Sequence, residues 1–509
     1  MRTFSPKKNK NNNKKLDDNT LTDNLSNNVN MFKDIFSYPT NMDFIVREIY
    51  VNGLNKKGAV LFLDVMIDND RLEKHVISPL IDTDFNDANK TLNDLTDKIL
   101  RASKVEKRSV FKDAIEDITQ GKAVVLVDSY KEVLSIELIG YKHRSVESTQ
   151  IENVIKGPKE AFTESNQVNR SLIRKYLKNE NLVTERIPVG EKNLTDISML
   201  YLKDIADPEL VKSVRERIRQ IKADGVQNIT LLEQHIEERP YSLVPTLLYT
   251  ERPDRAVAFL NEGHIVLLDQ SPACLVLPVT FWSLFHSSED QYSRWAYANF
   301  MRIIRFISFL ITLLTPAIYV GMINYHAALI PTDLLLSIAA SREVLPFPGI
   351  IEVLLMEISF EILREAGVRI PKTIGAAISI VGVLILGEAA VEANIVSPIM
   401  VIIISITGLS SFAIPETSTN YMIRLARFVF LASAIFIGFL GIAICLVASV
   451  AYLCSIKSFG VSFLSPYAPY YPSSRDMIFR SPIWKQWLRP FNISPQDKVR
   501  VGRKGGTTQ

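Results

Sequence analysis

The residues best suited to chemistry are ionisable side chains that stand among apolar ones in the second half of the chain. A charge inside a bilayer is costly and is by default a candidate for function. At about 100° per residue, Glu357, Glu361, Arg364 and Glu365 share one helix face about 100° wide. Repeated carboxylates on one helix favour cations. The candidate pore or gating residues are Glu352, Glu357, Glu361, Arg364, Glu365 and Glu388.

Five of these six residues belong to one helix, predicted over 348–366, which follows a Pro-Phe-Pro-Gly turn. The opposite face carries Val353, Leu354 and Ile358. Because of its charges, this helix cannot face lipid along its whole length. Three positions stay open for it: the membrane interface, the interior of a helix bundle, or the wall of a water-filled path. Only the last is a conduction site.

Glu388 lies near the end of the next apolar stretch, about one turn deeper than Glu392. Glu392 stands beside a predicted short loop, where water can hydrate it. Glu388 is the sharper candidate, and three states stay open for it. It can be protonated, paired with an arginine such as Arg364, or exposed to a channel.

Catalytic motifs are absent from the sequence. Gly121-Lys122 lacks the earlier glycine of a phosphate-binding loop, and neither H-E-x-x-H nor G-x-S-x-G occurs. The six histidines are scattered, and the three cysteines form no C-x-x-C pair or Cys/His cluster. We therefore expect no enzyme activity, no metal site, no disulfide framework and no cofactor.

The composition is uneven along the 509 residues. Hydrophobic residues make up 47% and charged residues 22%, but Lys, Asp, Glu and Asn concentrate before about residue 300. Ile, Leu, Val, Ala and Phe dominate the later part. The net charge of +3 comes from interleaved acids and bases, which argues against nucleic-acid binding.

This asymmetry predicts a soluble α/β half of two small subdomains, followed by an all-α polytopic membrane domain. The N-terminal tail is rich in Asn and Lys and has no apolar stretch of a signal peptide, so we expect it to be disordered and the soluble half to be cytoplasmic. The predicted parts are a tail at 1–40, subdomains at 41–155 and 156–290, a membrane domain at 291–455 and a basic cytoplasmic tail at 456–509.

The two subdomains share a sequence pattern: a glycine and a basic residue, then an apolar run that ends at an aspartate. Gly121-Lys122 precedes an apolar run that ends at Asp128, and Gly263-His264 precedes another that ends at Asp269. A second strand follows each run. Such a pattern is common in α/β proteins. Two interpretations therefore stay open: the similarity arises by chance, or the two subdomains are related.

Four apolar stretches are long enough to span a bilayer: 303–323, 373–391, 395–414 and 428–453. Arg294, Trp295, Tyr297, Arg302 and Arg305 precede the first and are typical of interface anchors. With the charged helix spanning there are five spans, and without it four. The basic tail favours four, because that places the tail in the cytoplasm.

Several long motifs resemble the GerA family of spore germination proteins. The family's signature loop corresponds to Ser341, Arg342, Glu343, Pro346, Phe347 and Pro348. Further matching segments are 157–164, 169–177, 249–255, 360–398 and 411–416. The resemblance is to the A-type subunit and covers about residues 150–455, and less distinctly the part from 41.

Two departures from the family pattern stand out. Val344-Leu345 replaces the usual Gly-Val before Pro-Phe-Pro, which removes a flexible residue from the loop. Glu388 stands where the family commonly has Gln, and Ala393-Asn394 replaces Ala-Gly. These departures bear on gating rather than on membership.

The resemblance implies a multi-pass protein of the inner spore membrane that acts with B-type and C-type subunits, the B-type being transporter-like and the C-type a lipoprotein. It implies a nutrient germinant receptor whose A subunits form a homo-oligomer in membrane lipid with an ion channel. The alternative is an accessory germination membrane protein, a scaffold or channel that does not itself respond to nutrients.

Overall fold

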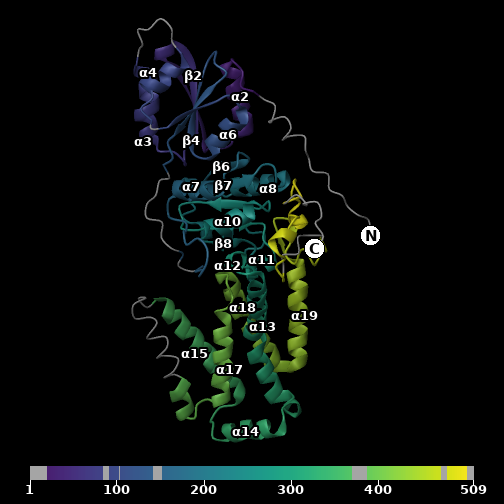
Figure 1. The fold of residues 1–509 in the computed structure, drawn as a ribbon. Helices are drawn as coiled ribbons and strands as arrows, with labels where there is room; N and C mark the ends of the chain where they lie inside the picture. The colour runs from purple at the N-terminus through teal and green to yellow at the C-terminus, as the bar shows by residue number, and fades with distance from the viewer. Residues whose placement is uncertain are drawn as a thin grey trace.

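The computed structural model describes residues 20–83, 91–102, 104–140, 149, 152–369, 387–471 and 478–500. Its α/β half and its helical half lie at opposite ends of an elongated molecule (Figure 1). The first subdomain is farthest from the helices, and the second lies between. The predicted order of an α/β half followed by an all-helical half is confirmed.

Each subdomain is built on a five-stranded antiparallel sheet. The first sheet has the order β1-β2-β4-β5-β3, with β1 at Phe44–Val51, β2 at Lys56–Leu63, β3 at Val105–Arg108, β4 at Lys122–Val127 and β5 at Val133–Glu137. The second has the order β6-β7-β9-β10-β8, with β6 at Leu182–Val189, β7 at Thr195–Leu202, β8 at Leu248–Thr250, β9 at Ile265–Leu268 and β10 at Cys274–Leu277.

The two sheets have the same strand order when each is numbered from its own first strand. In each, a helix (α6, Phe111–Thr119, or α10, Pro253–Leu260) leads into the central hairpin. Gly121 and Gly263 join helix to strand with φ of 91° and 105°, which only glycine adopts at little cost. The shared architecture of the subdomains, left open by the sequence, is thus present in the fold.

Helices cover both sheets and bury their apolar faces on them. Their bounds are α2 Leu25–Ile35, α3 Asn69–Leu72, α4 Ser78–Asp82, α5 Leu92–Asp94, α7 Asn166–Tyr176, α8 Pro208–Arg219 and α9 Ile229–Ile236. Asp207 caps α8 and accepts from the Glu209 amide at 3.1 Å.

Helix α2 differs from the predicted disordered tail. Asn24 caps it, and Phe32 and Phe36, one turn apart, are fully buried against the first sheet and α6. These two aromatic side chains supply the apolar surface that the rest of the tail lacks. Residues 1–19 lie outside the described part of the chain.

A buried ion-pair cluster joins the two subdomains. Asp43, just before β1, accepts from Arg174 Nε of α7 at 3.1 Å and from Thr184 Oγ1 of β6 at 2.6 Å, and it also pairs with Arg170. Burial alone would raise the pKa of Asp43, but the Arg174 and Arg170 guanidiniums outweigh it and lower that pKa. This carboxylate is therefore ionised inside the interface.

Replacement of Asp43 by Asn is expected to destabilise the chain by about 3–5 kcal/mol, because it leaves two buried guanidiniums without a counter-charge. Urea unfolding of the purified protein measures the loss. Asp34→Asn, at an exposed position on α2, is the matched control. Equal stabilities of the two variants would contradict the role given to Asp43.

The helical half contains the long helices of the chain. They are α13 Trp295–Tyr325, α14 Thr332–Glu343, α15 Gly349–Arg369, α17 Pro398–Ser411, α18 Thr417–Ile437 and α19 Phe439–Ser455, preceded by the short α11 Phe281–Phe285 and α12 Glu289–Tyr292. Within the described residues, α13 and α18 are long and apolar enough to cross a membrane, whereas α17 and α19 are apolar but shorter. Helix α13 packs against both α17 and α18 (Figure 1).

Among the described residues, the first predicted span coincides with the long apolar helix α13, and the predicted span 395–414 contains the shorter α17. The prediction of a single span over 428–453 is wrong, because the chain turns at Gly438 (φ 67°) between α18 and α19. The Tyr325 hydroxyl donates to the Ile435 carbonyl at 2.6 Å and satisfies one group freed by the turn. Most of the predicted span 373–391 lies outside the described residues.

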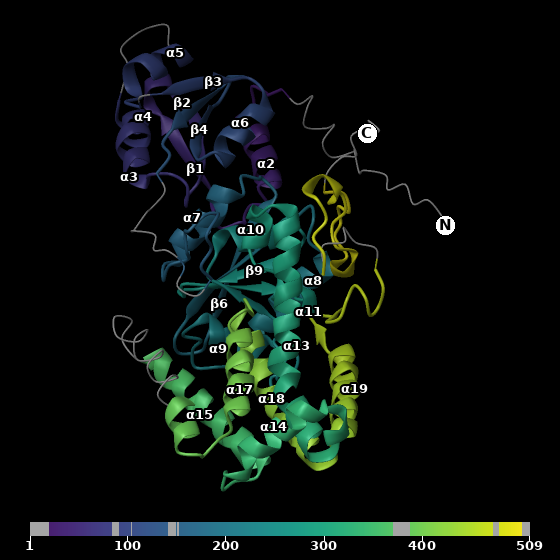
Figure 2. The same ribbon diagram turned by 60° about the horizontal axis from the view of Figure 1, so that its bottom comes forward.

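After α19 the chain returns to the second subdomain. The Phe281 amide donates to the Phe463 carbonyl at 2.8 Å, and the Gln496 amide donates to the Ile205 carbonyl at 2.9 Å. Figure 2 shows this C-terminal tail beside α8 and α11, well away from α14. The N-terminal half and the tail therefore lie at the same end of the helical bundle.

Candidate functional site: buried ion pairs in the helical half

A neutral cluster of two acids and two arginines lies inside the bundle. We call Glu357 and Glu361 of α15 with Arg424 and Arg427 of α18 the bundle cluster. Arg427 Nη2 lies 2.6 Å from Glu357 Oε2 and 2.8 Å from Glu361 Oε1, and Arg424 pairs with Glu361. Glu357 and Arg427 are 0% and 1% exposed. Such burial is tolerated only because the charges are paired.

Helical spacing explains why these side chains meet. Glu357 and Glu361 are four residues apart, and Arg424 and Arg427 are three apart, so each pair lies on one face of its helix. The face of α15 that carries Glu357 and Glu361 is buried against the bundle, whereas Ile351, Ile358 and Ile362 are exposed, so the surroundings of α15 in a membrane stay a prediction. The observed α15 begins one residue after the predicted 348–366 and ends three residues further on.

Arg364 also points into the bundle, but toward a different partner. It donates to Ser411 Oγ of α17 at 2.6 Å and lies against the rings of Phe360 and Phe412, 5.1 and 5.0 Å from their centroids. Its Nε and Nη1 are buried without a hydrogen-bond partner among the described residues. Arg364 is therefore not the partner of Glu388.

Glu352 forms a second buried site at the start of α15. It is 1% exposed, accepts from the Ser397 amide at 3.1 Å and lies 3.4 Å from Arg342 Nε. Gly349 makes this pairing possible, because a Cβ there would lie 2.6 Å from Arg342 Nη2. The Arg342 side chain thus crosses over the backbone of α15 to reach Glu352.

The remaining predicted site residues lie elsewhere. Glu365 is exposed and pairs with Arg369 at 2.8 Å, and Glu388 is exposed in a short helical stretch. In the signature segment, Ser341, Arg342 and Glu343 end helix α14 rather than forming a loop, and Pro346, Phe347 and Pro348 form an exposed link to α15.

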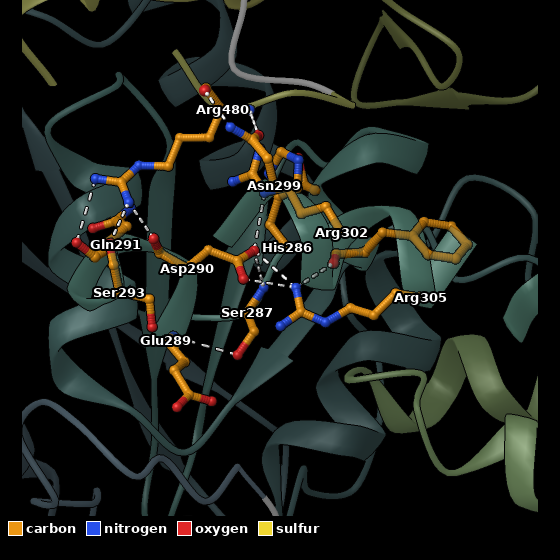
Figure 3. A network of polar contacts seen from close by, with 12 residues as sticks. His286, Ser287, Glu289, Asp290, Gln291, Ser293, Asn299, Arg302, Arg305 and Arg480 are labelled. Atoms are coloured by element: carbon orange, nitrogen blue, oxygen red, sulfur yellow. Dashed lines mark hydrogen bonds and ion pairs between the residues drawn. The ribbon is translucent and has the colours of Figure 1, made fainter. Parts of the chain in front are cut away.

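A separate junction cluster holds the top of α13 to the soluble half (Figure 3). It consists of Asp290 of α12, Asn299, Arg302 and Arg305 of α13, and Arg480 of the tail. Asp290 is 2% exposed and accepts from Arg302 Nε at 3.1 Å and from Arg305 Nη1 at 2.8 Å. The Arg480 amide donates to Asn299 Oδ1 at 2.7 Å, and its guanidinium reaches the Asp290 carbonyl.

Sequence reasoning missed this junction cluster. It interpreted Arg302 and Arg305 as interface anchors, but both are buried and have a protein partner. Their spacing of three residues on one helix face was a signal for a shared counter-ion. Nothing in the sequence pointed to Asp290 or Arg480. Trp295 and Tyr297 are exposed, as an interface anchor requires.

Three carboxylates lie close enough to interact electrostatically: Glu233 of α9, Glu237 just after it, and Glu416 at the start of α18. Burial, and then the charges of Glu237 and Glu416, raise the pKa of Glu233 to about 8. This pKa lies above the ordinary 4.5 of a glutamate. Between pH 4.5 and about 8, Glu233 therefore stays protonated in the folded chain but loses its proton in the unfolded chain. Stability is expected to fall as the pH rises from about 4.5 to about 8.

Glu233→Gln is expected to flatten this part of the pH profile, because the glutamine cannot ionise. Thermal unfolding of the full chain in detergent, repeated across that pH range, measures the slope. The control is Glu216→Gln, an exposed residue of α8 that should keep the wild-type slope. Parallel profiles for wild type and Glu233→Gln would contradict the assignment.

No group of three or more His, Cys, Asp and Glu side chains within the described ranges is arranged to hold a metal ion.

Comparison with known proteins gives consistent matches. The profile described as Bacillus/Clostridium GerA spore germination protein matches residues 30–492. Spore germination protein KA of Bacillus subtilis (strain 168) is 38% identical over 464 residues, 91% of this chain and 85% of that protein. Spore germination protein GerLA of Bacillus cereus is 35% identical over 459 residues, 90% and 93% of the two chains.

Two further proteins are also similar to this chain. The uncharacterized membrane protein YfkQ of Bacillus subtilis (strain 168) is 38% identical over 455 residues, 89% of this chain and 88% of that protein. Among solved structures, the N-terminal domain of the A subunit of the Bacillus megaterium spore germinant receptor GerK3 matches with a TM-score of 0.42 and 26% identity. The match covers 52% of this chain and 98% of that one.

Proposed function

Because the chain belongs to the GerA family of spore germination proteins, we propose that it is the A-type subunit of a nutrient germinant receptor. In this proposal it resides in the inner spore membrane and initiates germination. Several copies form a nutrient-gated ion channel, with B-type and C-type subunits as partners. The observation that carries the proposal is the match to spore germination relatives over most of the chain.

The bundle cluster supports a role in gating. Paired charges buried between α15 and α18 are costly to separate in a low-dielectric interior, so they favour two discrete helix arrangements over a continuous range. In the described arrangement Glu357 and Glu361 are neutralised by arginines. A cation path past these acids requires α15 to move relative to α18, or several copies to contribute their faces.

The position of the tail supports an even number of membrane crossings. Helix α13 begins beside the second subdomain, and α19 ends there, where Arg239 Nη2 donates to the Ser455 carbonyl at 3.1 Å. Chain segments that contact one another directly must lie on the same side of a bilayer. This favours an even number of crossings, four rather than five, with the soluble half and the basic tail together in the cytoplasm, on the spore-core side.

The second candidate function is an accessory germination membrane protein that does not respond to nutrients. It is supported by the match to YfkQ, an uncharacterized membrane protein that is 38% identical to this chain, as protein KA is. Adjacent genes for B-type and C-type subunits favour the receptor. An isolated gene favours the accessory protein.

The test expresses the chain with its neighbouring B-type and C-type genes as the sole receptor of a spore. Early K⁺ release after addition of mixed amino acids and sugars is expected, and it should disappear when the chain is deleted. Glu357→Gln combined with Glu361→Gln should change the release, whereas Glu365→Gln, on an exposed side chain, should not. The amount of chain in the spore membrane is measured on the same samples. K⁺ release that is unchanged by deletion would overturn the proposal.

A further inference from the structure

A loop of the second subdomain lies against the C-terminal end of α19. It comprises residues 237–243, just after α9, and we call it the base loop. Arg239 Nη1 donates to Ser455 Oγ at 3.0 Å, and Arg239 Nη2 donates to the Ser455 carbonyl at 3.1 Å. Ser242 Oγ lies 2.9 Å from the Tyr452 hydroxyl. Two separate contacts therefore fix the base loop to the last turn of α19.

The base loop exposes apolar side chains on either side of Ser242. Tyr241 is 98% exposed, and Leu243 is about half exposed. Neither belongs to a hydrophobic core cluster of the described residues. A single exposed apolar residue is ordinary on a protein surface, so exposure alone assigns no role to these two. Their position beside the end of an apolar helix is what distinguishes them.

The other end of α19 lies at a polar surface. The turn at Gly438 joins α19 to α18, and the His326 ring stacks on Phe439 just after this turn, with the ring centroids 4.9 Å apart. His326 and the nearby Asn324 are exposed. Polar side chains of this kind favour water or headgroups over hydrocarbon. The turn is therefore expected at the far boundary of a bilayer rather than inside its core.

The length of α19 then sets the depth of the base loop. The helix has 17 residues, and at about 1.5 Å per residue it is about 25 Å long. The hydrocarbon core of a bilayer is about 30 Å thick. A crossing by α19 that starts at the far boundary therefore ends at or just inside the near boundary. The base loop, which is bound to Ser455, lies at the same depth.

An exposed apolar stripe on α19 leads to the base loop. Its members lie four, three and four residues apart on one helix face, and they are Leu440, Ile444, Val447 and Ala451. The next position along this stripe is Ser455, where the base loop is attached. An apolar stripe that ends beside an exposed tyrosine matches an environment that changes from hydrocarbon to headgroups.

Charge near the base loop is mixed rather than basic. Glu237 and Glu238 precede Arg239 in the chain. Glu238 pairs with Arg217 of α8 at 2.8 Å, and Arg239 is bound to the end of α19. Attraction to anionic lipids needs clustered Lys or Arg side chains. A lipid contact at this loop therefore depends on its apolar side chains.

We propose that the base loop anchors the second subdomain to the lipid surface. Tyr241 and Leu243 enter the boundary between headgroups and acyl chains, and the tyrosine hydroxyl stays in the headgroup region. The contacts of Arg239 and Ser242 with α19 hold the loop at this depth. The anchor thereby fixes the orientation of the subdomain relative to the bilayer. This inference rests on the proposed membrane location of the chain and adds a lipid contact of the soluble half.

Depth-dependent fluorescence quenching of the full chain in phosphatidylcholine vesicles tests the anchor. Cys445→Ala combined with Cys454→Ala leaves Cys274, which is fully buried, as the remaining native cysteine. Tyr241→Cys in this background carries the fluorophore. A nitroxide near the lipid headgroup is expected to quench it roughly twofold more strongly than a nitroxide at the end of the acyl chain. Added salt should leave this ratio unchanged, because the contact is apolar.

Two further labelled positions calibrate the measurement. Val447→Cys, in the middle of α19, should be quenched more strongly by the deep nitroxide. Tyr50→Cys replaces an exposed tyrosine of β1 in the first subdomain, which is farthest from the helices (Figure 1), and should be quenched by neither.

A second variant changes the anchor itself. In a chain labelled at Leu243→Cys, Tyr241→Asp should lower quenching by the shallow nitroxide, because a carboxylate is excluded from the boundary. Tyr241→Trp should keep this quenching, because tryptophan is also favoured at the interface. Since Tyr241 is almost fully exposed, neither substitution disturbs the packing of the chain.

The outcomes separate the anchor from the membrane location. Quenching at Val447 without quenching at Tyr241 would overturn the anchor and leave the membrane location in place, and quenching at neither would overturn both. Quenching at Tyr241 that appears only at high dilution of the chain in lipid would identify a second copy as the partner of the loop and reject lipid. None of these results depends on K⁺ release, so failure of the anchor and failure of the channel proposal can be told apart.

Discussion

Replacing Arg427 by Met is expected to be among the most damaging single substitutions in the helical half. It leaves Glu357, which is fully buried, without its counter-charge, while Glu361 keeps Arg424. Breaking a buried pair from one side costs about 3–5 kcal/mol, because the remaining charge stays desolvated. Thermal unfolding in detergent and the amount of chain in the membrane measure this loss.

A double variant separates the pair's contribution from simple loss of packing. Glu357→Gln together with Arg427→Met removes both charges and should recover most of the stability lost by Arg427→Met alone. Arg369→Met is the matched control, since Arg369 forms an exposed pair with Glu365 and should cost little. If the double variant is as unstable as the sum of the single variants, Glu357 and Arg427 are not coupled.

The local features of the fold were predictable from sequence because they depend on neighbouring residues. The glycines at 121 and 263 mark the same helix-to-strand turn in both sheets, and the cap at Asp207 starts α8. The charged helix α15 was located by its turn and its period. In each case the residues that predict the feature lie within one or two helical turns of it in the chain.

Other features depend on residues far apart in the chain, and no local pattern encodes them. Arg427 meets Glu357 across 70 positions, so the sequence predicted a charged face without its partner. For the same reason the face could be assigned to water, lipid or protein. The break at Gly438 was hidden in an apolar run, where a glycine is compatible with a continuous span. The return of the tail to the second subdomain had no signal at all.

Asp290→Asn is expected to release α13 from the soluble half, and its effect should match that of Arg427→Met. Asn cannot neutralise Arg302 and Arg305, both of which are buried beside it, and a loss of about 3–5 kcal/mol follows. The contact of Arg480 with the Asp290 carbonyl does not depend on this charge, so the tail should stay bound.

The neighbouring Glu289 provides the matched control for this prediction. Its carboxylate points away from the junction cluster in Figure 3, so Glu289→Gln removes one charge from the same short helix without touching Arg302 or Arg305. Arg480→Met is the complementary variant, because it removes the tail's guanidinium contact and keeps the Asp290 charge. Trypsin cleavage after Lys485 should rise in Arg480→Met but not in Asp290→Asn.

The functional readout distinguishes a coupling element from a merely structural one. If the junction cluster couples the soluble half to the helices, Asp290→Asn chains that reach the membrane should lose K⁺ release. A structural role alone would reduce K⁺ release only in proportion to the amount of chain. Wild-type K⁺ release per chain in Asp290→Asn would show that the junction cluster does not transmit the signal to α13. The bundle cluster would then be the remaining candidate for gating.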